Sequence, residues 1–150
     1  MIIRRAEIND CIGLSELNKQ CLPIYYTPIE FFMMALSLQY IVFVVEYEGK
    51  IVGYMVGEFH LNDKNYHILS IGVDKLHRSK GIGEKVISEL INLVKSQIDN
   101  ITLYVHVENE KAVKFYEKEG FMIVETIKNY YQGSLKANSQ DAHRMKKILV

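Results

Sequence analysis

The sequence predicts a single α+β domain in which a mixed β-sheet is flanked by helices. After a short first strand and two helical segments, two strand-like runs form a hairpin, and later runs alternate with helical patterns, which is the order of an antiparallel sheet continued by a parallel strand. The chain has 150 residues, of which 49% are hydrophobic, and this is enough to bury one core. We find no repeat, low-complexity tract or linker, so one domain over residues 1–150 is expected.

Local signals delimit the elements in order. An Asn or Asp at 9–10 can cap the first helix, Pro23 ends it, and an aromatic loop over 22–27 precedes Pro28 at the start of the second. The dipeptide at 48–49 predicts a hairpin turn, and a later helix has apolar residues at helical spacing until its end near 98. Gly120 stops the last helix. The expected strands are 2–6, 40–47, 50–59, 66–73, 101–107, 121–129 and 143–149, and the expected helices begin at 9, 28, 83 and 109.

Composition narrows the classes of partner. Eighteen basic and eighteen acidic residues give a net charge of zero, which favours neither a nucleic acid nor a membrane surface. Cys11 and Cys21 do not have the spacing of a redox motif, and the histidines are dispersed, so no metal is expected. The N-terminus lacks the apolar segment of a signal peptide, and residues 31–45 are too short to span a bilayer, so we expect a cytoplasmic protein.

A basic glycine loop follows the strand at 66–73. Its residues are Arg78, Ser79, Lys80, Gly81, Ile82 and Gly83. Backbone amides at the start of a helix bind anions such as a pyrophosphate, and glycine lets the backbone approach a ligand closely. Taken alone, an R-x-x-G-x-G loop is more often an ordinary basic turn capped by glycine.

A second motif lies about thirty residues later, in the stretch from Asn109 to Phe121, with the pattern N-x-x-A-x-x-F-Y-x-x-x-G-F. The two motifs together resemble those of the GNAT acetyltransferases, over nearly the whole chain. Leu22-Pro23-Ile24-Tyr25-Tyr26 and Lys128-Asn129-Tyr130-Tyr131 further resemble the acceptor loops of protein N-terminal acetyltransferases of the NatE and NatA types. The bacterial ribosomal-protein alanine acetyltransferase shares the core.

This resemblance implies the GNAT acyl-CoA N-acyltransferase fold, a three-layer arrangement with splayed central strands, and transfer of acetyl from acetyl-CoA to the N-terminal α-amine of a peptide or protein. The strands at 66–73 and 101–107 would hold the pantetheine. The implied cofactor-binding residues are Ile71, Gly72 and Val73 through their backbone, residues 78–83 at the pyrophosphate, Asn109 at the pantetheine, and Tyr116 near the thioester.

The resemblance also suggests three catalytic side chains. Tyr116 would protonate the leaving thiolate as general acid. The NatE type has tyrosine at the position of His67 and histidine at that of Tyr104, so the two residue types are exchanged here. We expect His67 to act as base through a water that Tyr104 orients, because an imidazole with a pKa near 6.5 suits the task. His67 as a half-buried structural residue, or Tyr104 as a packing residue, remain alternatives, and His106 shares the face of Tyr104.

Acceptor specificity is expected to depend on the two loops. Pro23, Ile24 and Leu69 would line an apolar pocket that prefers methionine to serine or alanine as first residue. Tyr26, Tyr130 and Tyr131 would contact the peptide backbone. Two alternatives stay open: acetylation of a small amine or amino acid, and a non-catalytic CoA-binding subunit. The sequence is silent on any partner subunit or ribosome association.

Overall fold

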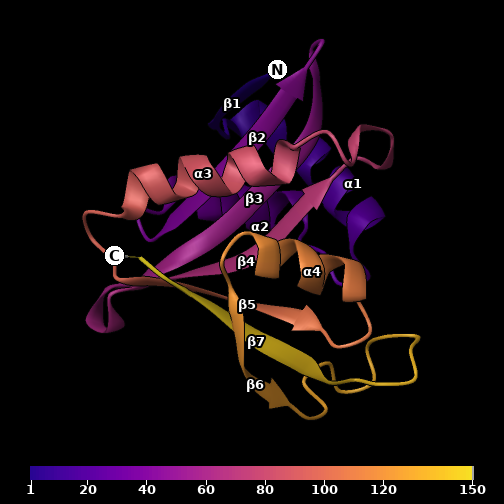
Figure 1. Ribbon diagram of the computed structural model, residues 1–150. Helices are drawn as coiled ribbons and strands as arrows, with labels where there is room; N and C mark the ends of the chain where they lie inside the picture. Colours follow the sequence, from indigo (N-terminus) through magenta and orange to yellow (C-terminus); the bar gives the residue numbers. More distant parts are fainter. Residues whose placement is uncertain (150) are drawn as a thin grey trace.

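A computed structural model describes residues 1–149 and places seven strands in one mixed sheet, in the order β1-β2-β3-β4-β5-β7-β6 (Figure 1). Its strands are antiparallel except at the junction of β4 with β5, which is parallel, as expected. The strands are β1 (Ile2–Arg5), β2 (Tyr40–Tyr47), β3 (Lys50–His60), β4 (Asn65–Val73), β5 (Asn100–His106), β6 (Met122–Ile127) and β7 (Ala142–Ile148). The helices are α1 (Cys11–Cys21), α2 (Pro28–Leu36), α3 (Ile82–Val94) and α4 (Glu110–Lys118).

Helices cover both faces of the sheet and give the expected three layers. In Figure 1, α3 and α4 lie in front of the sheet, and α1 and α2 lie behind it. The front core joins β2–β5 to buried α3 residues such as Val86 and Leu90, and the rear core packs Leu14, Phe31 and Tyr54 together. Each amphipathic helix thus buries its apolar stripe against one side of the sheet.

Most predicted boundaries agree with the structure to within two residues, and helix α3 is the main exception. The sequence pattern predicts that it continues to residue 98, but it ends at Val94. Ile98 remains buried in the core, which explains the misleading periodicity. The chain has to turn before β5, and the backbone N–H of Asp99 donates to the carbonyl of Lys64 at 2.8 Å to begin that strand. Short 3-10 turns at Ile8–Asp10 and Lys75–His77 were not foreseen, whereas the one at Leu61–Asp63 lies where a turn is expected between the strands at 50–59 and 66–73.

Strands β4 and β5 pair over only part of their length. The parallel register runs from Asn65 opposite Asn100 to Ile68 opposite Leu103, and no pairing follows. Beyond this point β4 continues along β3 while β5 continues along β7, so the two strands diverge in Figure 1. This divergence is the splay that the resemblance implies, and it leaves one edge of β4 without a neighbouring strand.

A β-bulge lies where the two strands separate. In the β3–β4 pair, Val56 lies opposite Ser70 and Gly57 opposite Ile68, so Leu69 is the extra residue. A bulge places two successive side chains on nearly the same face of a strand. Leu69 packs on the rear core and Ser70 bonds to Tyr54 of that core, so both side chains face the α1–α2 side.

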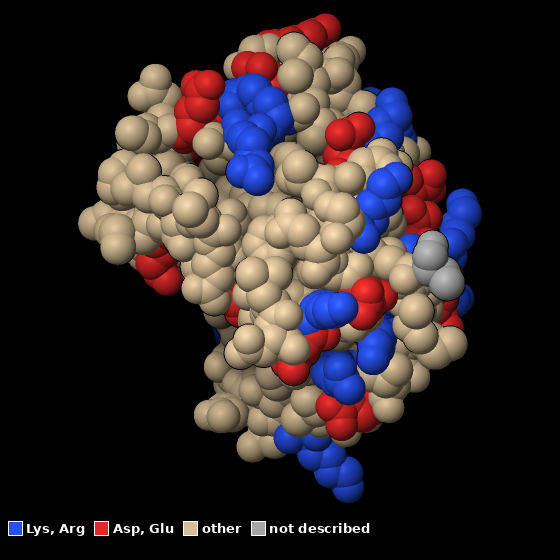
Figure 2. All heavy atoms as spheres, turned by 90° about the vertical axis from the view of Figure 1, so that its left-hand side faces the viewer, with Lys and Arg blue, Asp and Glu red and all other residues tan. Residues whose placement is uncertain are grey.

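Charged side chains show no preference for one sign on the face seen in Figure 2, where acidic and basic groups are interspersed around a broad uncharged area. None of the helices within residues 1–149 has the length and apolar character needed to cross a membrane. The same residues contain no group of three or more side chains placed to hold a metal ion.

Candidate active site

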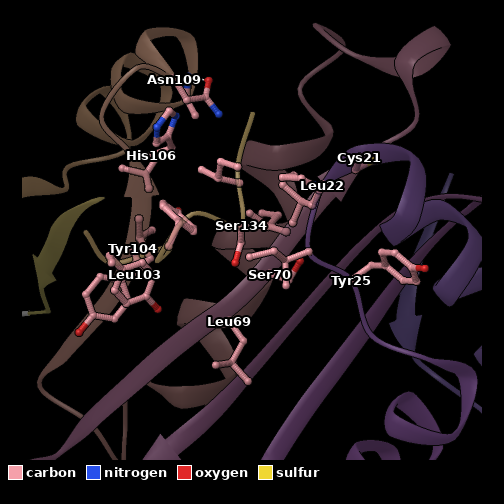
Figure 3. A pocket seen from close by; sticks show the side chains of 18 of the residues that line it. Cys21, Leu22, Tyr25, Leu69, Ser70, Leu103, Tyr104, His106, Asn109 and Ser134 are labelled. Carbon is pink, nitrogen blue, oxygen red and sulfur yellow. Dashed lines mark hydrogen bonds between the residues drawn. The ribbon is translucent and has the colours of Figure 1, made fainter. Parts of the chain in front are cut away.

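A cleft of about 1340 Å³ opens where β4 and β5 diverge. Figure 3 shows Leu69 and Ser70 on β4 between Tyr104 and His106 on one side and Leu22 on the other. The cleft brings together most of the side chains predicted for the site. The predicted residues that line it are Pro23, Ile24, Tyr26, His67, Leu69, Ile71, Tyr104, Asn109, Tyr116, Tyr130 and Tyr131.

Gly72, Val73 and the glycine loop are the predicted residues outside the cleft lining. They continue from the far end of β4 into α3, whose N-cap is Gly81 with a left-handed φ of 77°. The Nε of Arg78 donates to the carbonyl of Val73 at 2.9 Å and so ties the loop back to the strand. Gly83 lies against α4, because a Cβ there would lie 2.9 Å from Cζ of Phe115. The glycine loop therefore forms the start of α3, next to the diverging strands, and is held in place by contacts with β4 and α4.

The open edge of β4 fits a linear amide-bearing ligand, because unpaired backbone groups can bond it as an added strand would. Asn109, across the cleft on the β5 side, caps α4: its Oδ1 accepts from the backbone N–H of Ala112 at 3.2 Å. This leaves the amide NH₂ of Asn109 for a ligand. The carbonyl of Val73 already accepts from Arg78, and also from the Cys21 thiol at 3.5 Å.

His67 lies near the base of the cleft, where the strands are still paired. Its Nδ1 lies 2.8 Å from Oγ1 of Thr102 on β5, and Nδ2 of Asn65 donates to the same hydroxyl at 2.9 Å. Burial lowers the pKa of His67 to about 4, helped by His60 and Arg144 and opposed by Glu58. The expectation of an unperturbed pKa near 6.5 is therefore wrong: desolvation keeps the imidazole neutral, and a weaker base, at physiological pH.

Tyr104 joins His67 to the C-terminal loop. Its ring meets the His67 ring edge to face at 5.2 Å between centroids, and it stacks on Tyr130 at 4.6 Å. His106 also lines the cleft, on the same face as Tyr104, as predicted. Its Nε2 lies 2.7 Å from the carbonyl oxygen of Ser139, so it anchors the segment that follows β6.

Tyr116 projects from α4 into the cleft wall, with 8% of its surface exposed. Its ring packs edge to face on Phe115 and Phe121. Burial raises the pKa of its phenol well above the usual value, so the hydroxyl stays protonated. A protonated hydroxyl at this position can donate a proton or a hydrogen bond.

Buried polar side chains hold the loop between α1 and α2. The Oγ of Ser15 donates to the carbonyl of Tyr26 at 2.7 Å, and the backbone N–H of Tyr26 donates to Oδ1 of Asn18 at 2.7 Å. Asn18 is fully buried. Sequence reasoning missed it, although a polar residue beside Leu14 and Leu17 on the inner face of a helix is a visible signal.

The opposite wall of the cleft is a compact loop between β6 and β7, in a region for which the sequence predicts only a polar connection. Gln140 organises it: its Oε1 accepts from the backbone N–H groups of Gly133 and Leu135, and its Nε2 donates to the carbonyl of Leu135. This loop adds residues to the cleft that were not predicted, namely Gln132, Ser134, Leu135, Lys136 and Ala137.

The family profile for the acetyltransferase (GNAT) family matches residues 12–121. The chain belongs to the GNAT acetyltransferases. It is 30% identical to the N-terminal acetyltransferase A complex catalytic subunit NAA10 of Arabidopsis thaliana, over 98% of this chain and 77% of that protein. A stretch of 90 residues, 59% of this chain, is 39% identical to N-alpha-acetyltransferase 50 of Danio rerio and covers 52% of that protein.

Solved structures agree with this family and with its fold. The enzyme superposes on Ard1 from Thermoplasma volcanium with a TM-score of 0.85 and 26% identity, over 99% of this chain and 97% of that one. The ribosomal-protein-S18-alanine N-acetyltransferase of Escherichia coli gives a TM-score of 0.84 at 20% identity, which supports the fold. The GNAT fold and an acetyltransferase activity follow from the sequence and structural matches together.

Proposed function

We propose that this acetyltransferase transfers the acetyl group of acetyl-CoA to the N-terminal α-amine of peptides or proteins. The observation that carries the proposal is the cleft itself, whose acceptor end is walled by the Tyr26 loop on one side and by Tyr130 and Tyr131 on the other. Relatives that align with 95–99% of this chain are named as a catalytic subunit of an N-terminal acetyltransferase complex or as N-alpha-acetyltransferases. An Arabidopsis thaliana Naa50 of the same fold was solved with a CoA-peptide bisubstrate analogue.

Acetyl-CoA supplies an activated acyl thioester, and the chain offers groups suited to each of its parts. The open edge of β4 at Ile71, Gly72 and Val73 would bond the pantetheine amides, and Asn109 would bond the same arm. The amides of residues 78–83 at the start of α3 would receive the pyrophosphate. Tyr116 would lie near the thioester sulfur.

In the reaction the amine nitrogen forms a bond to the acyl carbon, the carbon–sulfur bond breaks, and one proton passes from the amine to the CoA thiolate overall. A peptide α-amine has a pKa of about 7.7–8, so part of it is already neutral near pH 7.5. His67 would accept the proton that the attacking amine loses, through a water that Tyr104 orients. Desolvation keeps the imidazole neutral, so that its lone pair is available for this proton. Tyr116 would donate a proton to the thiolate.

The proposed acceptor preference is methionine followed by a hydrophobic residue. Pro23, Ile24 and Leu69 line the same cleft with apolar surface and offer no partner to a serine hydroxyl. A difference in the size of the first side chain, such as methionine against serine, changes kcat/KM in an apolar pocket by about 10- to 200-fold.

A panel of short peptides, spermidine and free amino acids, assayed by release of CoA thiol, tests the proposal. Met-Leu and Met-Val peptides should react fastest. The Ile24→Glu variant should lose this preference, with Leu36→Glu, a change of exposed residue away from the cleft, as matched control. Equal rates for Ser- and Met-starting peptides would disprove the preference.

An Nα-blocked Met peptide with a free lysine serves as control for the position of transfer. Faster acetylation of spermidine or of a free amino acid than of any peptide would favour a small-amine acetyltransferase instead. Binding of acetyl-CoA with no turnover on any amine would favour a non-catalytic subunit.

A further inference from the structure

A chain of buried hydrogen bonds runs from the acceptor loop to the cleft. It begins at the backbone N–H of Tyr26, which donates to Oδ1 of Asn18 at 2.7 Å. A backbone N–H can only donate, so this contact fixes which end of the Asn18 amide is oxygen. The other end, Nδ2, therefore donates to Oη of Tyr54 at 2.8 Å.

The direction of the next bond follows from burial. Tyr54 is 1% exposed, and its Oη lies 2.8 Å from Oγ of Ser70. Oη already accepts from Asn18, and its single proton needs an acceptor, which Ser70 supplies. The reverse direction would leave a buried phenol proton unbonded, which is costly. Nδ2 of Asn18 adds a longer bond to Oγ of Ser70 at 3.4 Å.

Ser70 thus accepts bonds from Tyr54 and Asn18, and its own proton is left without a use in this network. Ser70 lies at the bulge of β4 and lines the cleft, in the centre of Figure 3. The bulge turns the Ser70 side chain to the α1–α2 side of the sheet, beside Leu69. The hydroxyl proton is therefore available to a ligand atom in the cleft.

We propose that Ser70 is a substrate-binding residue that donates a hydrogen bond to a carbonyl oxygen in the cleft, and that Asn18 and Tyr54 are positioning residues that direct its proton there. The inference rests on the proposed function for the nature of the substrates. Both substrates carry a suitable carbonyl, the acyl carbonyl of the thioester and the first peptide carbonyl of the acceptor.

Gly72 is part of the same arrangement. A Cβ at this position would lie 2.5 Å from Cε1 of Tyr54, a distance that real side chains essentially never show. The absence of a side chain at residue 72 leaves room for the Tyr54 ring to lie close to β4 and reach Ser70. Gly72, predicted from sequence as a cofactor-binding residue, thus has a structural role in this network.

The decisive variants are Ser70→Ala, which removes the donor, and Asn18→Asp, which is nearly isosteric. A carboxylate at residue 18 still accepts from Tyr26 but can no longer donate to Tyr54. The Tyr54 proton would turn toward residue 18, and the Ser70 proton would turn back toward Tyr54. Ser134→Ala, which removes another hydroxyl of the cleft lining, is the matched control.

Three measurements show which carbonyl oxygen accepts the Ser70 hydrogen bond. The first is the carbonyl stretching band of bound 13C-labelled acetyl-CoA, and the second is the affinity for acetyl-CoA by calorimetry. The third is KM for whichever amine the wild type acetylates in the panel. If the acyl carbonyl is the acceptor, Ser70→Ala and Asn18→Asp should both raise the band frequency. If the peptide carbonyl is the acceptor, the band should stay and KM for the peptide should rise about 10-fold. Hydrogen exchange at Tyr26 verifies that the loop stays folded in Asn18→Asp.

The proposal is overturned if Ser70→Ala leaves the band, the affinity and KM as in the wild type. Ser70→Ala decides alone if Asn18→Asp fails to fold. The band and the affinity require no acceptor, so they report on Ser70 even if peptides prove to be the wrong substrates. A wild type that acetylates only small amines would contradict the proposed function and leave this test intact.

Discussion

The rings of His67 and Tyr104 meet edge to face, with centroids 5.2 Å apart, at the point where β4 and β5 separate. Both rings line the cleft, and Tyr130, in the loop between β6 and β7, stacks on Tyr104. The relationship depends on the parallel register, which places His67 opposite Thr102, two residues before Tyr104. The same register would thereby position both the proposed base, His67, and the phenol of Tyr104 that is proposed to orient its water.

The pH dependence of catalysis is the first prediction. Because the pKa of His67 is lowered to about 4, the side chain is neutral throughout pH 5.5–9 and should add no step to kcat/KM near pH 6.5. The acidic limb should instead follow the acceptor amine, near pH 7.7–8 for a peptide. His67→Gln should lower kcat/KM about 100-fold without moving the limb. A limb near 6.5 that disappears in this variant would show that His67 titrates normally, and an undiminished rate would exclude it as base.

The tautomer of His67 is the second prediction. To act as base at Nε2, the ring must carry its proton on Nδ1 and donate it to Thr102. The Thr102 proton then needs an acceptor. In the structure Nδ2 of Asn65 faces Thr102, so the prediction requires this amide to turn by 180° and present Oδ1 instead. Asn65 Oδ1 is the one buried side-chain oxygen or nitrogen without a partner in the part of the chain described, so this amide has no competing bond at its oxygen.

Nitrogen-15 NMR of the histidines should therefore show neutral His67 with the proton on Nδ1. Thr102→Val should change the tautomer ratio and lower kcat, and Thr102→Ser should restore both. A wild-type ring protonated on Nε2 would contradict the assignment of His67 as base.

Stability against acid is the third prediction. Above pH 6.5 His67 is neutral in both the folded and the unfolded chain, so it contributes no pH dependence. Between pH 6.5 and 4 the unfolded chain binds a proton that the folded chain does not, so stability falls as the pH falls. The full loss is on the order of 3 kcal/mol. Urea unfolding of the wild type and His67→Gln between pH 4 and 7 should show a difference that grows toward low pH, and parallel curves would contradict it.

Local sequence signals account for much of the fold. The turn at 48–49 lies where the pattern predicts, and α3 and α4 begin within one residue of their predicted starts at 83 and 109, because turns and helix starts depend on residues adjacent in the chain. The end of α3 was misjudged because Ile98 is buried by tertiary packing outside the helix. Periodicity reports burial, and it does not distinguish a helical residue from a buried turn residue.

The polar networks of the site could not be predicted in this way. His67 and Thr102 are 35 residues apart in sequence, and their contact exists only in one register of a parallel pair. The link from Asn18 to Ser70 spans 52 residues and needs both the helix packing and the bulge. Desolvation of His67 likewise depends on what covers it, so its pKa is not readable from the sequence.

The proposed proton donor gives the fourth prediction. Burial raises the pKa of the Tyr116 phenol and keeps it protonated, so Tyr116→Phe should remove the proposed donor and leave the packing on Phe115 and Phe121 intact. Loss of a general acid typically costs about 100- to 10,000-fold in rate. We expect kcat to fall in this range while the affinity for acetyl-CoA, measured by calorimetry, changes little. A thioester with a more acidic leaving thiol should restore part of the loss, and equal loss for both thioesters would argue for a packing role.

The contact between α3 and α4 gives the fifth prediction. A methyl group at Gly83 would lie 2.9 Å from Cζ of Phe115, so Gly83→Ala must push the Phe115 ring away. Phe115 precedes Tyr116 on α4, and Asn109 caps the same helix, so a displaced α4 moves two predicted cofactor-binding residues. We expect weaker binding of acetyl-CoA by about 10-fold, as a loss of about 1–2 kcal/mol from overpacking implies.

Gly83→Ala combined with Phe115→Leu should recover affinity because the shorter side chain makes room. Gly13→Ala in α1, where a Cβ would lie at an ordinary contact distance of 3.4 Å from Cδ1 of Ile51, controls for general effects of glycine replacement. If the double variant binds no better than Gly83→Ala alone, the loss comes from the glycine loop itself and not from the contact with α4.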